Sequence, residues 1–447
     1  MVQIDEIIPK ASIIWKKTRY LKNSFARINR FPRELLGHIP TFFESERDLI
    51  NTTTVCRHWR TTLLSTPQLW CSISGSSAPK IRAYLERSKR RPLNVHLTSP
   101  DSARLLCPDI RRVASLHLDL FAQSQMERTS EHLFDPASSL RVLSIHSLHP
   151  THTLEIPPAF LGGSFPSLRT LIMEEISSFS GPHVFPSVTS LTLSTNSYVR
   201  LDTTSLVNAL GRLPSLETVS IKFRSRWVPT PITGDRTVTL QNLRKMSLSQ
   251  TNNTGDARMG PILCGLHLPK LERLEIHSRY TLESDSPCFP SSFPSLLPNF
   301  SELPKAIITF GSGSCKLHFQ SECQHALDIF VGRLSISQET RKLLGGLPLR
   351  SVRSLAVGPT ERADWEFLFG MLKAMDGIED LEIGGDWASL LRFWREGREW
   401  ERLCPALCRL RVYGGEGHEP ELAVFEGARR DIGLPLTAMH ILRGEDD

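Results

Sequence analysis

The chain has 447 residues, of which 40% are hydrophobic and 22% charged, and its formal net charge is +6. This composition is typical of a globular protein with room for several domains, and it excludes a disordered or collagen-like chain. There is no run of eighteen apolar residues and no N-terminal secretory pattern, and the nine cysteines lack the spacing of a metal site. We therefore expect an intracellular protein with free thiols, in the cytoplasm, the nucleus or both.

Residues 1–30 are predicted to form a basic N-terminal arm with helical spacing. Seven lysines and arginines stand against two acidic residues there, and Ile14, Leu21, Phe25 and Ile28 fall on one helical face. Such a stretch can lie on a membrane surface or bind an acidic partner. We favour a loosely packed arm, so a membrane partner is not expected.

Residues 31–75 are predicted to hold three short helices. Pro32 suits the first helical position, and Ser45 is typical of the N-cap of the second helix. The threonines at 52–54 disfavour a continuous helix, so a break should precede a third helix over residues 55–63. Three such helices bury too little apolar surface to be stable alone. On spacing alone, a purely structural core and a partner-binding face explain their apolar stripes equally well.

Two motifs in this segment resemble an F-box, the module that docks substrate receptors onto the Skp adaptor of cullin-RING ubiquitin ligases. They are Phe31-Pro32-Arg33-Glu34-Leu35-Leu36 and Val55-Cys56-Arg57-His58-Trp59, and the family pattern is Leu-Pro-x-Glu-Leu-Leu followed by Val-Cys-Arg-x-Trp. Phe31 replaces the usual leucine, and Pro40, which should end or kink the first helix, replaces an aromatic residue. The resemblance implies that these residues face the adaptor or support that face: Pro32, Leu35, Leu36, Ile39, Leu49, Val55, Cys56 and Trp59.

Residues 76–98 are predicted to form a linker helix and the first strand. Residues 79–87 have helical apolar spacing, and the cations that follow suit a helix C-terminus. Pro92 ends the helix, and residues 93–97 alternate between apolar and polar as in a strand. The run KIRAYLERS followed by RPLNVHL resembles fungal F-box proteins whose C-terminal domains are leucine-rich-repeat-like.

Between residues 99 and 440, the pattern apolar-x-x-apolar-x-apolar occurs ten times, mostly at intervals near 27 residues. Leucine-rich repeats have periods of about 20–29 residues. A gap of 81 residues separates the seventh and eighth copies, and we expect residues 277–351 to hide two degenerate repeats. One candidate strand there is Cys315-Leu317-Phe319. The middle apolar residues of the ten copies are Leu116, Leu143, Leu171, Leu191, Val219, Met246, Leu274, Leu355, Leu381 and Leu410.

Helix-like patches between these copies, at residues 206–210, 326–330 and 365–372, complete an alternation of strands and helices. The alternation predicts an α/β fold: a short helical F-box followed by an irregular leucine-rich-repeat-like solenoid, a parallel β-sheet horseshoe with helices or loops on its convex side. The asparagine of the standard repeat is mostly missing, so the arc should be irregular. The period is too short for a β-propeller, whose blades need about 40–45 residues.

Within each copy, the residue between the last two apolar positions should point away from the core, because side chains alternate along a strand. These residues form the predicted concave row, which also includes Ile172 and Ala356. The candidate target-binding residues in it are Ser144, Thr192, Ser220, Ser247, Glu275, Glu382 and Arg411.

No catalytic motif is found: there is no GxSxG, no HExxH and no glycine-rich phosphate loop. We therefore expect a protein that is not an enzyme and has no cofactor or metal. No basic patch is interleaved with aromatic residues along the strands, so no nucleic-acid partner is expected. Residues 441–447 should form an acidic, solvated tail.

Two functions fit these features. The first is the substrate-recognition subunit of an SCF-type ubiquitin ligase, in which the F-box docks on a Skp-type adaptor, and through it on a cullin, while the repeats bind a protein target of unknown identity. The alternative is a ligase-independent interaction scaffold, in which the helical head packs internally and the repeats tether partners.

Overall fold

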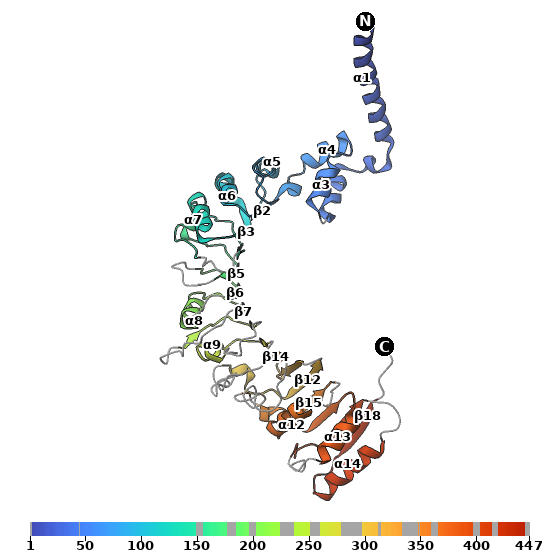
Figure 1. The fold of residues 1–447 in the computed structure, drawn as a ribbon, viewed down its shortest axis with the longest axis vertical. Helices are drawn as coiled ribbons and strands as arrows, with labels where there is room; N and C mark the ends of the chain where they lie inside the picture. The colour runs from blue at the N-terminus through green and yellow to red at the C-terminus, as the bar shows by residue number, and fades with distance from the viewer. Residues whose placement is uncertain are drawn as a thin grey trace.

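The computed structural model describes residues 2–43, 45–148, 155–176, 185–195, 203–223, 237–250, 260–278, 297–311, 314–332, 347, 349–358, 365–396, 403–413 and 419–442. An N-terminal helical region leads into a large, mostly parallel β-sheet that is covered by helices, so the fold is α/β. Figure 1 shows an open arc with strands along its inner side and helices along its outer side. Most of the predicted acidic tail lies outside the described residues.

The N-terminal region is a series of short helices after one long one. Pro40 ends the first short helix as predicted, because the chain continues there as a 3-10 turn. Ser45 caps the next helix by accepting a hydrogen bond from the Arg47 backbone N–H. That helix ends at Thr52, which confirms the predicted break. The elements are α1 (Val2–Phe25), η1 (Arg27–Arg30), α2 (Arg33–His38), η2 (Ile39–Phe42), α3 (Glu46–Thr52), α4 (Arg57–Leu64) and η3 (Pro67–Trp70).

Two boundaries in this region differ from the prediction. Pro32 is the N-cap of α2 and not its first residue, although its carbonyl still accepts the Leu36 N–H. The third helix begins at Arg57, because Cys56 has extended backbone angles (φ −158°, ψ 171°) that a helix does not allow. Val55 therefore lies in the connection before α4, where its side chain can reach solvent.

All ten predicted strands are present in one sheet of sixteen strands. Four strands of this sheet were not predicted as strands: β1, β12, β14 and β18. The strands are β1 (Ser72–Ser74), β2 (Leu93–Leu97), β3 (Val113–Leu120), β4 (Val142–Ser147), β5 (Thr170–Ile176), β6 (Ser190–Thr195), β7 (Thr218–Phe223), β9 (Lys245–Gln250), β11 (Arg273–Ser278), β12 (Lys305–Gly311), β13 (Ser314–Gln320), β14 (Ala326–Gly332), β15 (Ser354–Val357), β16 (Asp380–Ile383), β17 (Arg409–Tyr413) and β18 (Ala438–Leu442). A separate pair joins β8 (Val238–Thr239) to β10 (Leu266–His267).

The prediction of two degenerate repeats between β11 and β15 is wrong. Strands β12, β13 and β14 form an antiparallel meander that is inserted in reverse order, so that β14 pairs with β11 and β12 with β15. The candidate strand at residues 315–319 exists as β13, but it is antiparallel to both neighbours. Residues 326–330, read as a helix, are strand β14, in which Leu327 and Ile329 point into the core.

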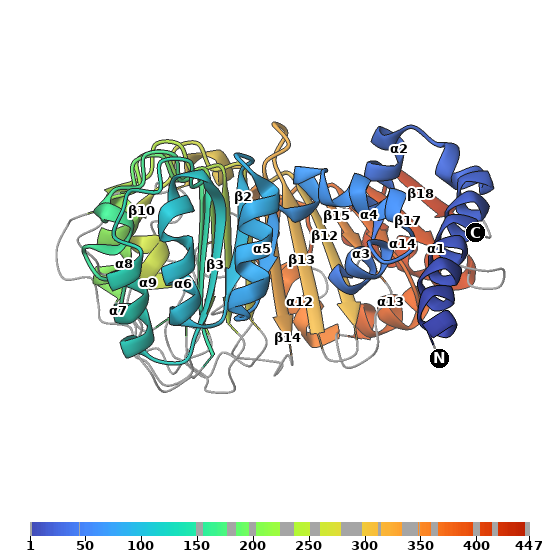
Figure 2. The same cartoon turned by 90° about the horizontal axis from the view of Figure 1, so that it is seen from above.

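Helices cover the buried face of the sheet, and Figure 2 shows them standing alongside the strands. The predicted helices at 79–87, 206–210 and 365–372 are confirmed as α5, α8 and α12. The helices and 3-10 turns are α5 (Ala78–Ser88), α6 (Pro100–Leu106), η4 (Cys107–Arg112), α7 (Gln123–His132), η5 (Phe160–Gly163), α8 (Thr203–Gly211), α9 (Gly260–Cys264), η6 (Pro298–Phe300), η7 (Leu349–Ser351), α12 (Trp365–Ala374), α13 (Trp387–Glu396) and α14 (Glu419–Asp431). One hydrophobic core runs along the whole sheet beneath them.

A hydrogen-bond ladder at the turns before the strands replaces part of the missing asparagine ladder. The serine or asparagine two residues after a buried Phe or Leu donates to a proline carbonyl of the preceding turn. Ser187 donates to Pro166 and Ser215 to Pro186, both at 2.7 Å. Asn242 continues the series by donating to Pro214 at 3.1 Å. These bonds satisfy carbonyls that the sheet leaves unpaired.

Candidate functional site

The head, residues 31–70, has a small core of its own. Leu36, Trp59 and Leu63 are buried against one another, with Ile39 and Cys56 packed at the edge. The indole Nε1 of Trp59 donates a 2.7 Å hydrogen bond to Asn29 Oδ1, so its one polar atom is satisfied. This core holds α2 and α4 together and thereby positions the surface residues beside them.

Large apolar side chains are concentrated on the surface of the N-terminal region. Among the described residues, twelve of the nineteen exposed large apolar side chains lie between Ile8 and Val55. Within the head, Leu35 is 53% and Val55 63% exposed, and Phe42 reaches 75%. An exposed apolar concentration of this kind is typical of a protein-binding surface.

The residues predicted to bind the adaptor divide into three groups by exposure. Pro32, Leu35 and Val55 are exposed and can touch a partner. Ile39 and Cys56 are partly buried at the edge of the head core. The remaining three are buried and can only support the surface: Leu36, Leu49 and Trp59.

Leu49 and its helix α3 join the head to the sheet. Leu49 packs into the main core and not into the head core. Three residues earlier, Glu46 accepts hydrogen bonds from Lys80 Nζ at 2.6 Å, Tyr84 Oη at 2.5 Å and Ser74 Oγ at 3.2 Å. The acidic residue therefore fastens α3 to β1 and α5, where the sheet begins.

The environment of Glu46 favours its ionised form. Partial burial alone would raise the pKa of this carboxyl, but the hydrogen bonds from Lys80 and Tyr84 and the charge of Lys80 outweigh it, and the pKa is lowered. Burial, together with the hydrogen bond to Glu46, raises the pKa of Tyr84, which stays a neutral donor. Sequence reasoning missed this junction, because Glu46 precedes its partners by 28 to 38 residues.

The residues of the predicted row lie in line across the sheet, in two stretches on either side of the inverted meander. They face one another in register on neighbouring strands: Ser144, Ile172, Thr192, Ser220, Ser247 and Glu275 in one stretch, and Ala356, Glu382 and Arg411 in the other. Each is partly exposed, while the flanking apolar residues are buried. All seven candidate target-binding residues therefore lie on the solvent face of the sheet.

The row also contains residues that the sequence analysis did not assign. His96 and His117 extend it beyond Ser144. Asp328, His318 and Ile307 carry it through the inverted meander. His117 lies between Leu116 and Leu118 in the first copy, so the alternation that placed the other residues could have placed it too. Asp328, His318 and Ile307 lie on strands that depart from the parallel repeat.

The charged members of this face are paired with one another. Asp328 contacts Arg273 at 3.0 Å and His318 at 2.7 Å. Further along, Glu382 contacts Arg411 at 3.4 Å and accepts the Tyr413 hydroxyl at 2.8 Å. The face therefore presents mixed polar groups with no single sign of charge, and its middle part, from β4 to β9, carries mainly small hydroxyl side chains.

At the end of the face near the head, Asp119 lies between two histidines. His96 Nε2 is 2.7 Å and His146 Nδ1 3.6 Å from its carboxylate oxygens. Burial and the neighbouring His96 lower the pKa of His117. No group of three or more His, Cys, Asp or Glu side chains is arranged to hold a metal ion in the described part of the chain. No helix in that part is long and apolar enough to cross a membrane.

Comparison with protein-family models finds no match for this chain, and no curated protein is similar enough to match it.

Proposed function

We propose that the chain is the substrate-recognition subunit of a cullin-RING ubiquitin ligase, with residues 31–75 acting as an F-box that docks on a Skp-type adaptor. The observation that carries the proposal is that each of the two motifs contains both buried and exposed apolar residues. Leu36 and Trp59 form the head core, whereas Leu35 and Val55, from the same two motifs, expose apolar side chains. Together with the ten other exposed large apolar side chains between Ile8 and Val55, these two supply apolar surface that a partner could cover.

The remainder of the chain is proposed to be an irregular leucine-rich-repeat-like solenoid that holds a protein target on its inner face. Strand order follows chain order on both sides of the inverted meander, and helices lie outside the curve. Solenoids of this kind offer an extended concave surface for protein partners. The row of Ser144, Thr192, Ser220, Ser247, Glu275, Glu382 and Arg411 is the proposed contact line.

Adaptor docking is tested with a double variant, Leu35→Asp with Val55→Asp, in a pull-down with purified Skp-type adaptor. Both side chains are exposed, so the head should stay folded while adaptor recovery falls to background. Phe134→Asp is the matched control, since Phe134 is 55% exposed but lies beyond α7. Equal recovery by the wild type and the double variant, or none by the wild type, would refute adaptor docking. Trp59→Ala is unsuitable here, because it removes part of the head core.

Target binding is tested by proximity labelling with the full chain, comparing wild type with Ser220→Arg and Ser247→Arg together. Two large cations at the middle of the row should remove the labelled target. Asn208→Arg, an exposed change on α8, should retain it. If a variant loses adaptor binding but still labels the target, adaptor docking and target binding are independent parts of the proposal. Target labelling by a wild-type chain that binds no adaptor would favour the ligase-independent scaffold.

A further inference from the structure

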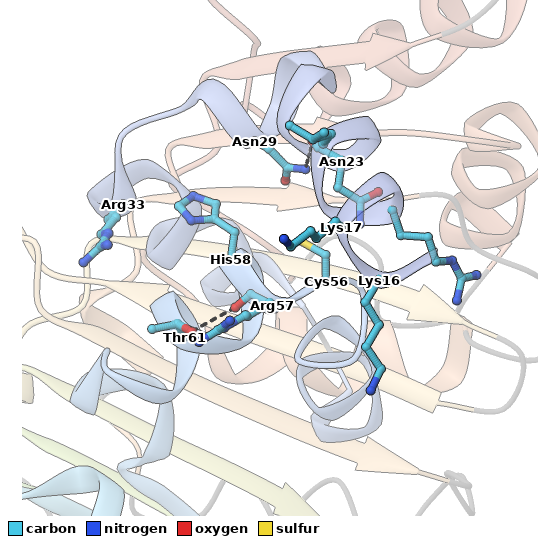
Figure 3. A pocket seen from close by; sticks show the side chains of 11 residues that line it. Lys16, Lys17, Asn23, Asn29, Arg33, Cys56, Arg57, His58 and Thr61 are labelled. Carbon is cyan, nitrogen blue, oxygen red and sulfur yellow. Dashed lines mark hydrogen bonds between the residues drawn. The ribbon is translucent and has the colours of Figure 1, made fainter. Parts of the chain in front are cut away.

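A basic pocket lies between the N-terminal helix α1 and the head. It has a volume of about 1110 Å³, and Figure 3 shows the side chains that line it. Its cationic side chains come from three helices, with α2 contributing Arg33 and α4 contributing Arg57. Lys16, Lys17 and Arg19 belong to α1. No Asp or Glu is among the lining residues of this pocket.

Within the described part of the chain, the cations of the pocket have no acidic partner. Lys16, Lys17, Arg33 and Arg57 form no ion pair with any residue in the described ranges, and the Arg19 guanidinium lies over the Trp15 ring at 5.2 Å. Five positive side chains around one cavity repel one another in the empty state. An anionic occupant would relieve this repulsion, which is why the cluster points to a ligand.

The N-terminus of α4 adds to the positive character of the same pocket. The helix begins at Arg57, and its N-cap residue, Cys56, makes no side-chain hydrogen bond to the helix. Cys56, Arg57 and His58 all line the pocket. An uncapped helix N-terminus attracts anions through its free N–H groups and its dipole. The buried Nε2 of His58 also has no hydrogen-bond partner.

We propose that this pocket binds an acidic segment of a partner protein. A pocket of about 1110 Å³ is much larger than one phosphate needs, and its cations are spread over three elements. A flat membrane surface would not fill a concave site that α4 and α1 enclose together. The apolar side chain of Leu21 on α1 lines the pocket and is exposed, so the bound segment carries an apolar residue among its carboxylates.

This site overlaps the proposed adaptor surface only at Cys56, which lies at the edge of the head core and also lines the pocket. Leu35 and Val55, which carry that surface, do not line the pocket. The variant Leu35→Asp with Val55→Asp should therefore keep full affinity for an acidic peptide. Failure of adaptor docking and failure of acidic-segment binding can be told apart in this way.

The test measures fluorescence anisotropy of a labelled synthetic peptide that repeats Asp-Glu-Leu, titrated with the full chain. The double variant Lys17→Glu with Arg57→Glu should weaken peptide binding by about tenfold or more. Attraction between these two cations and the carboxylates of the peptide is then replaced by repulsion. Raising salt from about 50 mM to about 300 mM should weaken wild-type binding several-fold. Arg60→Glu is the matched control, since Arg60 is exposed on α4 but does not line the pocket.

A second double variant controls for the possibility that Arg57→Glu unfolds the head. Lys16→Glu with Lys17→Glu changes only exposed residues of α1, so thermal unfolding of the rest of the chain should not move. Peptide binding that is unaffected by both double variants would overturn the proposal. Binding of inorganic phosphate or of phosphatidylserine vesicles that equals peptide binding and is lost in the same variants would also overturn it, because the site would then select charge alone.

Discussion

Replacing Glu46 with glutamine should loosen the junction between the head and the sheet. The substitution keeps the shape of the side chain but removes its charge and turns one acceptor into a donor. Lys80 and Tyr84, which both donate to Glu46, would then face either a weaker acceptor or an amide N–H. The change therefore tests whether this carboxylate fastens α3 to α5.

The expected loss of unfolding free energy is about 0.4–2 kcal/mol. A hydrogen bond to a charged group contributes about 1.5–3 kcal/mol when buried. Here the Lys80 and Glu46 side chains are 27% and 31% exposed, so solvent reduces the value of the pair toward the 0.2–1 kcal/mol that is typical of exposed pairs. Two strong acceptor contacts at this reduced value give the stated range.

The assay is urea unfolding followed by circular dichroism, with hydrogen exchange of α3 as a local readout. Glu86→Gln, an exposed change on α5, is the matched control and should leave both signals unchanged. Adding Tyr84→Phe completes a double-mutant cycle, in which the two changes should be less than additive. A loss of unfolding free energy below about 0.3 kcal/mol for Glu46→Gln would refute the reasoning, because a solvated surface charge behaves that way. Additive effects of Glu46→Gln and Tyr84→Phe would refute it as well.

The same carboxyl predicts a pH dependence. Its pKa is lowered in the folded state, so the unfolded chain binds more protons at acidic pH. The stabilisation by Glu46 is therefore present above the ordinary glutamate range and is lost as the pH falls through the lowered pKa. Glu46→Gln should flatten this acid decline, and an unchanged pH profile would contradict the assignment.

The remaining predictions concern single side chains. Trp59→Ala should cost about 3–5 kcal/mol in urea unfolding, whereas Leu35→Ala should cost less than about 0.5 kcal/mol, and similar losses would contradict their different burial. Arg429→Met should cost about 2–4 kcal/mol, because this fully buried guanidinium donates to four backbone carbonyls; a neutral effect would contradict that role. Burial and His96 lower the pKa of His117, so stability should fall as the pH drops through the ordinary histidine range, and His117→Gln should reduce that fall in thermal melts; an identical profile would contradict it.

Local patterns in the sequence were enough to predict the ten parallel strands and several of the helices. Each copy of the repeat places apolar residues such as Leu143 and Ile145 on one side of a short strand, and in several copies a proline before the strand ends the preceding segment. The break at residues 52–54 and the end of α2 near Pro40 were also predicted, because β-branched residues and proline act on the backbone where they stand. The alternation along each strand likewise placed Ser220 and Ser247 on the solvent face.

The tertiary structure alone decided how strands and side chains separated in sequence come together. Strands β12 to β14 show the same alternation as the repeats, and only pairing with β11 and β15 sets their reversed order. Leu35 and Leu36 are neighbours of equal hydrophobicity. Leu36 packs against Trp59 in the head core, whereas Leu35 is exposed and can contact a partner. The junction at Glu46 and the basic pocket also join residues from separate elements. Sequence patterns report the preferences of neighbouring residues, whereas these contacts depend on long-range packing, which decides which surface is left for binding.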